Sequence, residues 1–330
     1  MRRGGTIREY CLACERKLDL RPGCGARPEQ KAIVGIVNVN KPLGLTSHDV
    51  VDRVRNASGV KRVGHAGTLD PAASGVLLVC LGPATRISEY LMEGRKRYDA
   101  QIRLGISTDS GDSEGEIVYR AAKVDTTQDQ IERVLGGFGG PIEQIPPMHS
   151  ALKHQGIALY KLARRGMQVE RSPRLVEIYD LQVISWTPPV LRLIVECSKG
   201  TYIRALARDL GEKLGTGAHL LGLVRLGSGS FTLDSAVPLS TVEDSFVEGF
   251  WPQILHPLDE ALLHFDAIIV DLEAEKRICQ GQRVKGLEPL TTSLCRAYSP
   301  SGRFVALLQY DEEGKAWQPR KVFKLDEDTT

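Results

Sequence analysis

From residue 33 onward, short apolar runs alternate with segments in which apolar residues recur at helical spacing. Apolar runs of strand length predict β-strands, and so does the strict apolar-polar alternation of Tyr98–Leu104. The expected strands are residues 33–39, 76–81, 98–104 and 191–197. The pattern therefore predicts a sheet assembled from segments that are far apart in the chain.

Amphipathic helices are expected between these strands. One follows Ser47, its expected N-cap, and a second covers residues 128–135 after two threonines. A third begins at Arg204, with Arg204 and Arg208 expected to look outward, away from its apolar face. That face consists of Ile203, Leu206, Ala207, Leu210 and Leu214. Strands and helices mix without a regular βαβ order, which indicates an α/β (α+β) fold.

The two ends of the chain differ from its middle. Residues 1–31 have mixed charge and little apolar periodicity, so we expect a poorly ordered basic extension. Beyond residue 265 the pattern predicts a small β-rich domain covering residues 265–330. Its expected elements are strands at 267–270, 293–298, 304–310 and 321–325, and a helix at 273–280.

Composition is that of a soluble globular protein, with 42% hydrophobic and 25% charged residues in 330. No apolar run reaches the roughly 18 residues of a membrane span, and the first residues lead into no signal-peptide core, so a cytoplasmic location without membrane contact is expected. Seven scattered cysteines do not form a disulfide framework. Cys11, Cys14 and Cys24 offer three thiolates where a closed zinc site takes four ligands, so no metal is predicted.

Positive charge is concentrated rather than spread. The whole chain carries a formal charge of +2, whereas residues 149–174 alone carry +5 and residues 1–31 carry +4. A local basic stripe of this kind suits phosphate neutralisation, although a solvated amphipathic helix is the alternative. The cations of the stripe are Lys153, Lys161, Arg164, Arg165, Arg171 and Arg174.

The segment Gly64–Pro71 places one carboxylate, Asp70, in a glycine-flanked loop between two apolar segments. Glycines permit sharp turns and close approach to another molecule, and Pro71 biases Asp70 toward an extended conformation. The alternative is a helix start, with Asp70 as N-cap and Pro71 at the first helical position.

Four separated motifs, in order, resemble the bacterial TruB-type tRNA pseudouridine synthases. They are residues 64–75, 96–105, 145–153 and 197–204. The resemblance implies a pseudouridine synthase fold, in which helices flank a central mixed, largely antiparallel sheet. It implies a catalytic domain over residues 32–264, a thumb-like RNA-binding insertion at about 143–175, and a PUA-like module at 265–330.

The resemblance also implies an activity: conversion of the uridine at position 55, in the T loop of tRNA, to pseudouridine without cofactor or metal. The base would be flipped out, cut from its ribose, rotated and rejoined through C5. Asp70 corresponds to the essential carboxylate, Arg204 to the arginine that pairs with it, and Tyr98 to the tyrosine that stacks on the uracil and is suited to handle the C5 proton. Whether Asp70 attacks C1′, attacks C6 or removes the C2′ proton is left open.

Further residues of the motifs are expected to contact substrate or RNA. They are His65, Gly67, Thr68, Leu69, Lys96, Lys153, Arg164, Arg165, Lys199 and Tyr202. The expected partner is the T-arm stem-loop of tRNA, and the expected state is a monomer. Three alternatives remain: the same chemistry on another RNA, a T-arm-binding protein without catalysis, and a metal-dependent RNA enzyme, for which no ligand cluster is found.

Overall fold

The computed structural model describes residues 33–150, 152–163, 165–285 and 290–324. The predictions for residues 1–31, for Cys11, Cys14 and Cys24, and for Arg164 lie outside these ranges. Residues 33–330 form one compact unit.

A central sheet of eleven strands is built from residues 35–256, in the order β14-β1-β3-β12-β4-β11-β10-β7; outside this order, β2 pairs with β3, β13 with β12 and β15 with β1. Most neighbours are antiparallel, whereas β1 with β14 and β3 with β12 are parallel. This is the mixed, largely antiparallel sheet that was expected. The strands are β1 (Gly35–Lys41), β2 (Val63–Ala66), β3 (Ala73–Leu81), β4 (Lys96–Leu104), β7 (Gly140–Gln144), β10 (Arg174–Thr187), β11 (Val190–Cys197), β12 (Ala218–Ser228), β13 (Phe231–Thr232), β14 (Val237–Pro238) and β15 (Leu255–His256).

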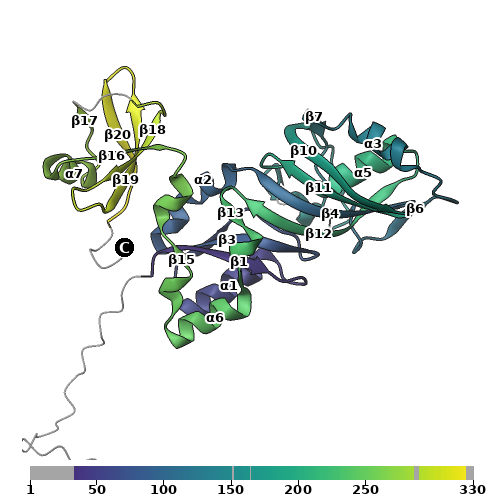
Figure 1. Cartoon of the computed structure of the whole chain (residues 1–330), viewed down its shortest axis with the longest axis horizontal. Helices are drawn as coiled ribbons and strands as arrows, with labels where there is room; N and C mark the ends of the chain where they lie inside the picture. Colours follow the sequence, from purple (N-terminus) through teal and green to yellow (C-terminus); the bar gives the residue numbers. More distant parts are fainter. Residues whose placement is uncertain (1–32, 151, 164, 286–289, 325–330) are drawn as a thin grey trace, which may run out of the picture. The chain divides into compact units, whose positions relative to one another are not determined.

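Helices bury their apolar faces against two parts of this sheet (Figure 1). Near β1 and β3, α1 (Ser47–Ser58) and α6 (Leu239–Glu248) enclose one core with valines and leucines of both strands. Near β4 and β11, α3 (Gln128–Leu135) and α5 (Ile203–Lys213) enclose another. A short helix, α2 (Ser88–Glu93), precedes β4. Strand β12 lies between β3 and β4 and so joins the two halves of the sheet.

Smaller elements complete the fold. Strands β5 (Ile106–Thr108) and β6 (Ile117–Arg120) form one hairpin, and β8 (Lys153–His154) and β9 (Ile157–Ala158), followed by α4 (Leu159–Ala163), lie in the basic segment. The C-terminal region forms a second sheet in the order β16-β18-β19-β20-β17 with one helix. Its elements are β16 (Asp266–Ile269), α7 (Leu272–Cys279), β17 (Val284–Lys285), β18 (Leu294–Tyr298), β19 (Phe304–Asp311) and β20 (Ala316–Val322).

Two local predictions were wrong. The last strand is Ala316–Val322 rather than 321–325; Pro319, which lacks an N–H, disguised it, and this proline lies at a register irregularity opposite Leu308. Thr46, not Ser47, caps α1: its hydroxyl accepts the N–H of Asp49 while the Asp49 side chain accepts the N–H of Thr46.

Ser47 instead ties α1 to the loop that carries Asp70. Its hydroxyl accepts the N–H of Leu69 at 2.8 Å and donates to the carbonyl of Leu69 at 3.0 Å. Ser47 and Leu69 are both buried, so these bonds satisfy backbone groups that water does not reach. The loop is thereby held against the first turn of α1.

No helix within the described residues has the length and apolar character to cross a membrane.

Ser47→Ala is expected to destabilise the fold by about 1–3 kcal/mol, because it leaves the buried N–H and carbonyl of Leu69 without this partner. Urea unfolding would measure the change. Ser88→Ala is the matched control, since its hydroxyl donates to the carbonyl of Thr85, which is three residues away in the chain. Equal destabilisation by the two variants would contradict the assigned role of Ser47.

Candidate active site

Asp70 lies in the turn between β2 and β3. The N–H of Ala73 donates to the carbonyl of Asp70 at 3.0 Å and β3 starts at once, so the alternative in which Asp70 caps a helix is wrong. Gly67 has a φ of +95°, a backbone conformation that residues with a Cβ rarely adopt. In this turn 43% of the side-chain surface of Asp70 stays exposed.

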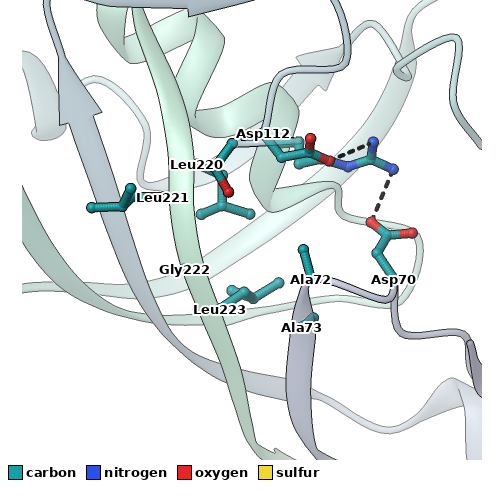
Figure 2. Close-up of a pocket in the computed structure, with 10 residues that line it drawn as sticks. Asp70, Ala72, Ala73, Asp112, Leu220, Leu221, Gly222 and Leu223 are labelled. Atoms are coloured by element: carbon teal, nitrogen blue, oxygen red, sulfur yellow. Dashed lines mark hydrogen bonds and ion pairs between the residues drawn. The ribbon is translucent and has the colours of Figure 1, made fainter. Parts of the chain in front are cut away.

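Arg204, at the start of α5, binds this carboxylate. One guanidinium nitrogen, Nη2, lies 2.9 Å from Oδ2 of Asp70, the ion pair drawn as a dashed line at Asp70 in Figure 2. The same nitrogen donates to the carbonyl of His149 at 2.7 Å. The expectation that Arg204 looks outward was wrong: its side chain is 7% exposed, whereas that of Arg208 is 29% exposed. Helical periodicity could not predict this, because it assigns a charged residue to the exposed face and carries no sign of the buried carboxylate, Asp112, that pairs with it.

The start of α5 is itself fixed from β7. Buried Gln144 donates its side-chain amide to the carbonyl of Tyr202 and accepts the N–H of the same residue, at 3.0 and 2.8 Å. Tyr202 precedes the first residue of α5, so this double hydrogen bond sets where the helix begins. The position of Arg204 therefore depends on β7 as well as on α5.

Asp112, which sequence reasoning missed, is the second carboxylate on Arg204. It comes from the loop between β5 and β6, and its Oδ2 lies 3.2 Å from Nη1 of Arg204. Its other oxygen accepts the N–H of Glu114 at 3.1 Å and the hydroxyl of Ser110. The loop sequence of serines, glycines and acids gave no sign of this pairing, because an ordinary exposed turn has the same composition.

The charge of Asp70 is set by opposing effects. Burial raises the pKa of its carboxyl above the usual value and is the largest of them; the cation of Arg204 lowers the pKa, and the anion of Asp112 raises it. Lys41, a fully buried lysine that sequence reasoning also missed, lowers the pKa further. The ammonium of Lys41 donates to the carbonyls of Pro42 and Leu45, and burial lowers its own pKa to about 8.

Tyr98 lies on β4, 8% exposed, on the same face as Ala100 and Ile102. Burial raises the pKa of its phenol, and the positive charge of Arg225, which stands opposite Tyr98 on the neighbouring strand β12, partly opposes that shift. The ring of Tyr98 thus packs within the hydrophobic core between β4, β11 and α5.

Lys96 has a structural role in this fold. Only 5% of the residue is exposed, and its ammonium donates to the carbonyls of Leu91, Met92 and Gly94, at the end of α2. Burial lowers its pKa to about 8. With all three N–H bonds given to backbone, Lys96 has no donor left for the expected RNA contact, so the structure argues against that role.

The other expected residues differ in burial and in the partners that their side chains contact. His65 is part-buried on β2, its Nδ1 has no hydrogen-bond partner within the described residues, and burial lowers its pKa. Gly67, Thr68 and Leu69 form the loop itself. Lys199 is exposed and pairs with Glu93 at 3.1 Å, and Lys153 and Arg165 are exposed in the basic segment.

A small open cavity adjoins the two carboxylates (Figure 2). Asp70, Asp112 and Arg204 form its polar side, and Leu220, Leu223 and Ala73 contribute apolar surface. The two carboxylates would repel a phosphate, so this cavity favours an uncharged group over an anion. Within the described ranges no group of three or more His, Cys, Asp or Glu side chains is arranged to hold a metal ion.

Comparison with known proteins places the whole arrangement in one family. Residues 55–203 match the TruB family pseudouridylate synthase N-terminal domain, and residues 204–263 match the tRNA pseudouridylate synthase B C-terminal domain. The tRNA pseudouridine synthase B of Dehalococcoides mccartyi is 46% identical over 88% of this chain and 96% of that protein. The enzyme of the same name from Hydrogenovibrio crunogenus is 40% identical over 91% and 97%.

Solved structures agree on the fold. A Cbf5-Nop10-Gar1 complex contains a chain that superposes with a TM-score of 0.68 at 27% identity, over 87% of this chain and 84% of that one. A chain of an H/ACA RNP bound to a substrate RNA containing 2′-deoxyuridine superposes with a TM-score of 0.66 at 24% identity, over 88% and 84%. Together with the sequence matches, these findings show that the chain belongs to the TruB family of pseudouridylate synthases.

Proposed function

We propose that this protein isomerises a uridine of tRNA to pseudouridine, and that its target is the uridine at position 55 in the T loop. The observation that carries the proposal is the Asp70 carboxylate, bound by buried Arg204 beside an apolar-lined cavity. The relatives named tRNA pseudouridine synthase B, which match nearly the full chain, support tRNA as the substrate.

The reaction moves the uracil from an N1 to a C5 attachment on the same ribose. The C1′–N1 bond breaks, the uracil turns, a C1′–C5 bond forms, and the C5 proton leaves while N1 gains one from solvent. Nothing is consumed, so the protein must supply a reactive carboxylate, a place for the detached base and protection from water. Asp70 is the proposed catalytic carboxylate, either as nucleophile or as base.

Arg204 favours the ionised form of Asp70, which this step needs. Burial favours the neutral acid, which is inert as nucleophile or base, and the adjoining guanidinium offsets that preference. Because Arg204 is also held by Asp112 and by the carbonyls of His149 and Ser110, its position does not depend on Asp70 alone. The carboxylate therefore has a fixed partner throughout the reaction.

The flipped uracil would lie beside Leu223 and Tyr98. Extruding a base costs a few kcal/mol, and stacking on an aromatic ring offsets about 1–3 kcal/mol of that cost. The Tyr98 phenol is the proposed acceptor for the C5 proton. RNA loops are recognised chiefly by shape and by extruded bases, which suits a T-loop target. The exposed cations of the basic segment are proposed to hold the surrounding phosphates.

Tritium release from C5 of a 5-tritiated T-arm stem-loop tests this function. The unaltered protein is expected to release tritium and Asp70→Asn to release none, while both bind the RNA. Asp99→Asn is the control, because Asp99 is a carboxylate of β4 that pairs with Arg192 rather than with Arg204.

Two other results would contradict the proposed substrate or the proposed activity. Release from a different RNA but not from the T arm would assign the same chemistry to another substrate. Binding without release by any variant, on any RNA, would mean that the protein clamps tRNA without catalysis.

Neutralising Arg164 and Arg165 together is expected to weaken RNA binding and to flatten its dependence on salt. Each lost phosphate contact should reduce the slope of log K against log salt by about 0.7–0.9. Binding titrations between low and high salt measure this slope. Lys123→Gln is the control, since Lys123 is exposed and paired with Asp125 outside the basic segment. An unchanged slope in the double variant would contradict phosphate binding by this segment.

A further inference from the structure

Arg225 is a buried arginine that lies against the turn of Asp70 and that the sequence did not single out. It belongs to β12, is 1% exposed, and stands opposite Gly75 of the neighbouring strand β3. A Cβ at Gly75 would lie 2.3 Å from the carbonyl oxygen of Arg225, and φ at Gly75 is +101°, so only glycine fits there. The backbone of Arg225 is therefore in close contact with the strand that follows Asp70.

The guanidinium of Arg225 binds the backbone on both sides of Asp70. Its Nη1 and Nη2 donate to the carbonyls of Thr68 and Gly67, each at 3.3 Å, and both residues precede Asp70. Its Nε donates to the carbonyl of Val76 at 2.6 Å, in the strand that follows Asp70. One side chain therefore connects the two ends of the turn in which the catalytic carboxylate lies.

The backbone conformation of Gly67 makes this contact possible. In an extended strand successive carbonyls point to opposite sides, so two neighbouring carbonyls do not face one side chain. The φ of Gly67 is +95°, outside the strand conformation, and its carbonyl and that of Thr68 face the same guanidinium. A Cβ at Gly67 would lie 3.7 Å from Nη1 of Arg225, an ordinary contact. Glycine is therefore favoured here by the conformation of the backbone rather than by a lack of space.

Arg225 has no carboxylate partner among the residues that the structure describes, and three backbone carbonyls accept its hydrogen bonds. A buried charge without an opposite charge is costly, and apolar side chains in such places are often neutral or stabilising. Stability alone therefore gives little reason for an arginine here. Arg204, in contrast, binds the carboxylates of Asp70 and Asp112. The two buried arginines differ in that one binds the carboxylate of Asp70 and the other binds the backbone around it.

The shape of the side chain suits this task. A guanidinium carries N–H donors on three nitrogens in a fixed plane, so it can bind carbonyls that lie in different directions at the same time. An ammonium has its donors on one nitrogen and cannot span the same carbonyls. The contact with both ends of the turn therefore depends on arginine at position 225, not on positive charge alone.

We propose that Arg225 is a positioning residue for Asp70: it holds both ends of the turn so that the carboxylate stays in place for reaction with the flipped uridine. Gly67 supplies the backbone conformation that this contact needs. The inference rests on the proposed function. Because Arg225 is buried, its loss affects the rate of the reaction and not the binding of RNA. A small displacement of a reacting group is enough to lower that rate strongly.

Arg225→Lys tests the inference, because lysine keeps the charge but cannot bind both ends of the turn. The single-turnover rate constant of tritium release, at saturating enzyme, is expected to fall by about tenfold or more, while the Kd for the T-arm stem-loop stays unchanged. Circular dichroism at the assay temperature establishes that the variant is folded, so a loss of stability alone would leave this rate constant unchanged. Arg192→Lys, at an exposed arginine of β11, is the matched control and is expected to keep the full rate.

Gly67→Ala is a second variant, which leaves Arg225 in place. It is expected to slow release as well, because alanine disfavours the conformation that turns the carbonyl of Gly67 toward the guanidinium. If both residues act through one contact, the double variant is expected to be no slower than the slower single variant. Gly59→Ala is the control, since Gly59 has a φ of +67° but lies at the end of α1. Its effect on the rate is expected to be small.

The outcomes separate the possible roles. An unchanged rate constant in folded Arg225→Lys, or a loss of turnover explained by a higher Kd, would overturn the inference. So would losses in Arg225→Lys and Gly67→Ala that multiply in the double variant. If Arg225→Lys does not fold, Arg225→Gln, whose N–H donors lie on one nitrogen, is measured instead with the same expected fall. Absence of tritium release by the unaltered protein would refute the proposed function instead.

Discussion

The buried guanidinium of Arg204 is the group on which the geometry of the site depends. It is shared between Asp70 and Asp112, which lie 42 residues apart in the chain, and it also donates to the backbone carbonyls of Ser110 and His149. The anion of Asp112 disfavours a second negative charge on Asp70, whereas the cations of Arg204 and Lys41 favour the ionised form that the reaction needs. The position of Arg204 depends in turn on Gln144, which fixes where α5 begins.

Around this ion pair, the loop of Asp70 is held from three directions. Ser47 binds Leu69 from α1, Arg225 binds the carbonyls of Gly67 and Thr68 from β12, and Arg204 binds the carboxylate itself. Loops in general are mobile, and catalysis needs groups that are held in place. Much of the sheet can be understood as a support for this one turn, since β3, β12 and β4 all contact it or its partners.

The sequence predicted the helices and strands around this site better than the side-chain contacts within it. Residues 128–135 form a helix with the predicted bounds, because capping residues and apolar periodicity agree there. The roles of Asp70, Tyr98 and Arg204 came from family motifs. Asp112 and Arg225 escaped notice because their partners lie 92 and about 150 residues away, where neither periodicity nor spacing carries a signal. Lys96 was expected to contact RNA because it lies in a family motif. Its ammonium instead donates to backbone carbonyls, and the sequence around a lysine does not indicate such bonds.

The central claim is that Arg204 keeps Asp70 ionised against the cost of burial. A ¹³C NMR titration of the Asp70 carboxyl measures this directly, in the unaltered protein and in Arg204→Gln. The pKa of Asp70 is expected to lie above the ordinary 3.8 in the unaltered protein and to rise further when the cation is removed. A pKa that is the same in both proteins would contradict the account.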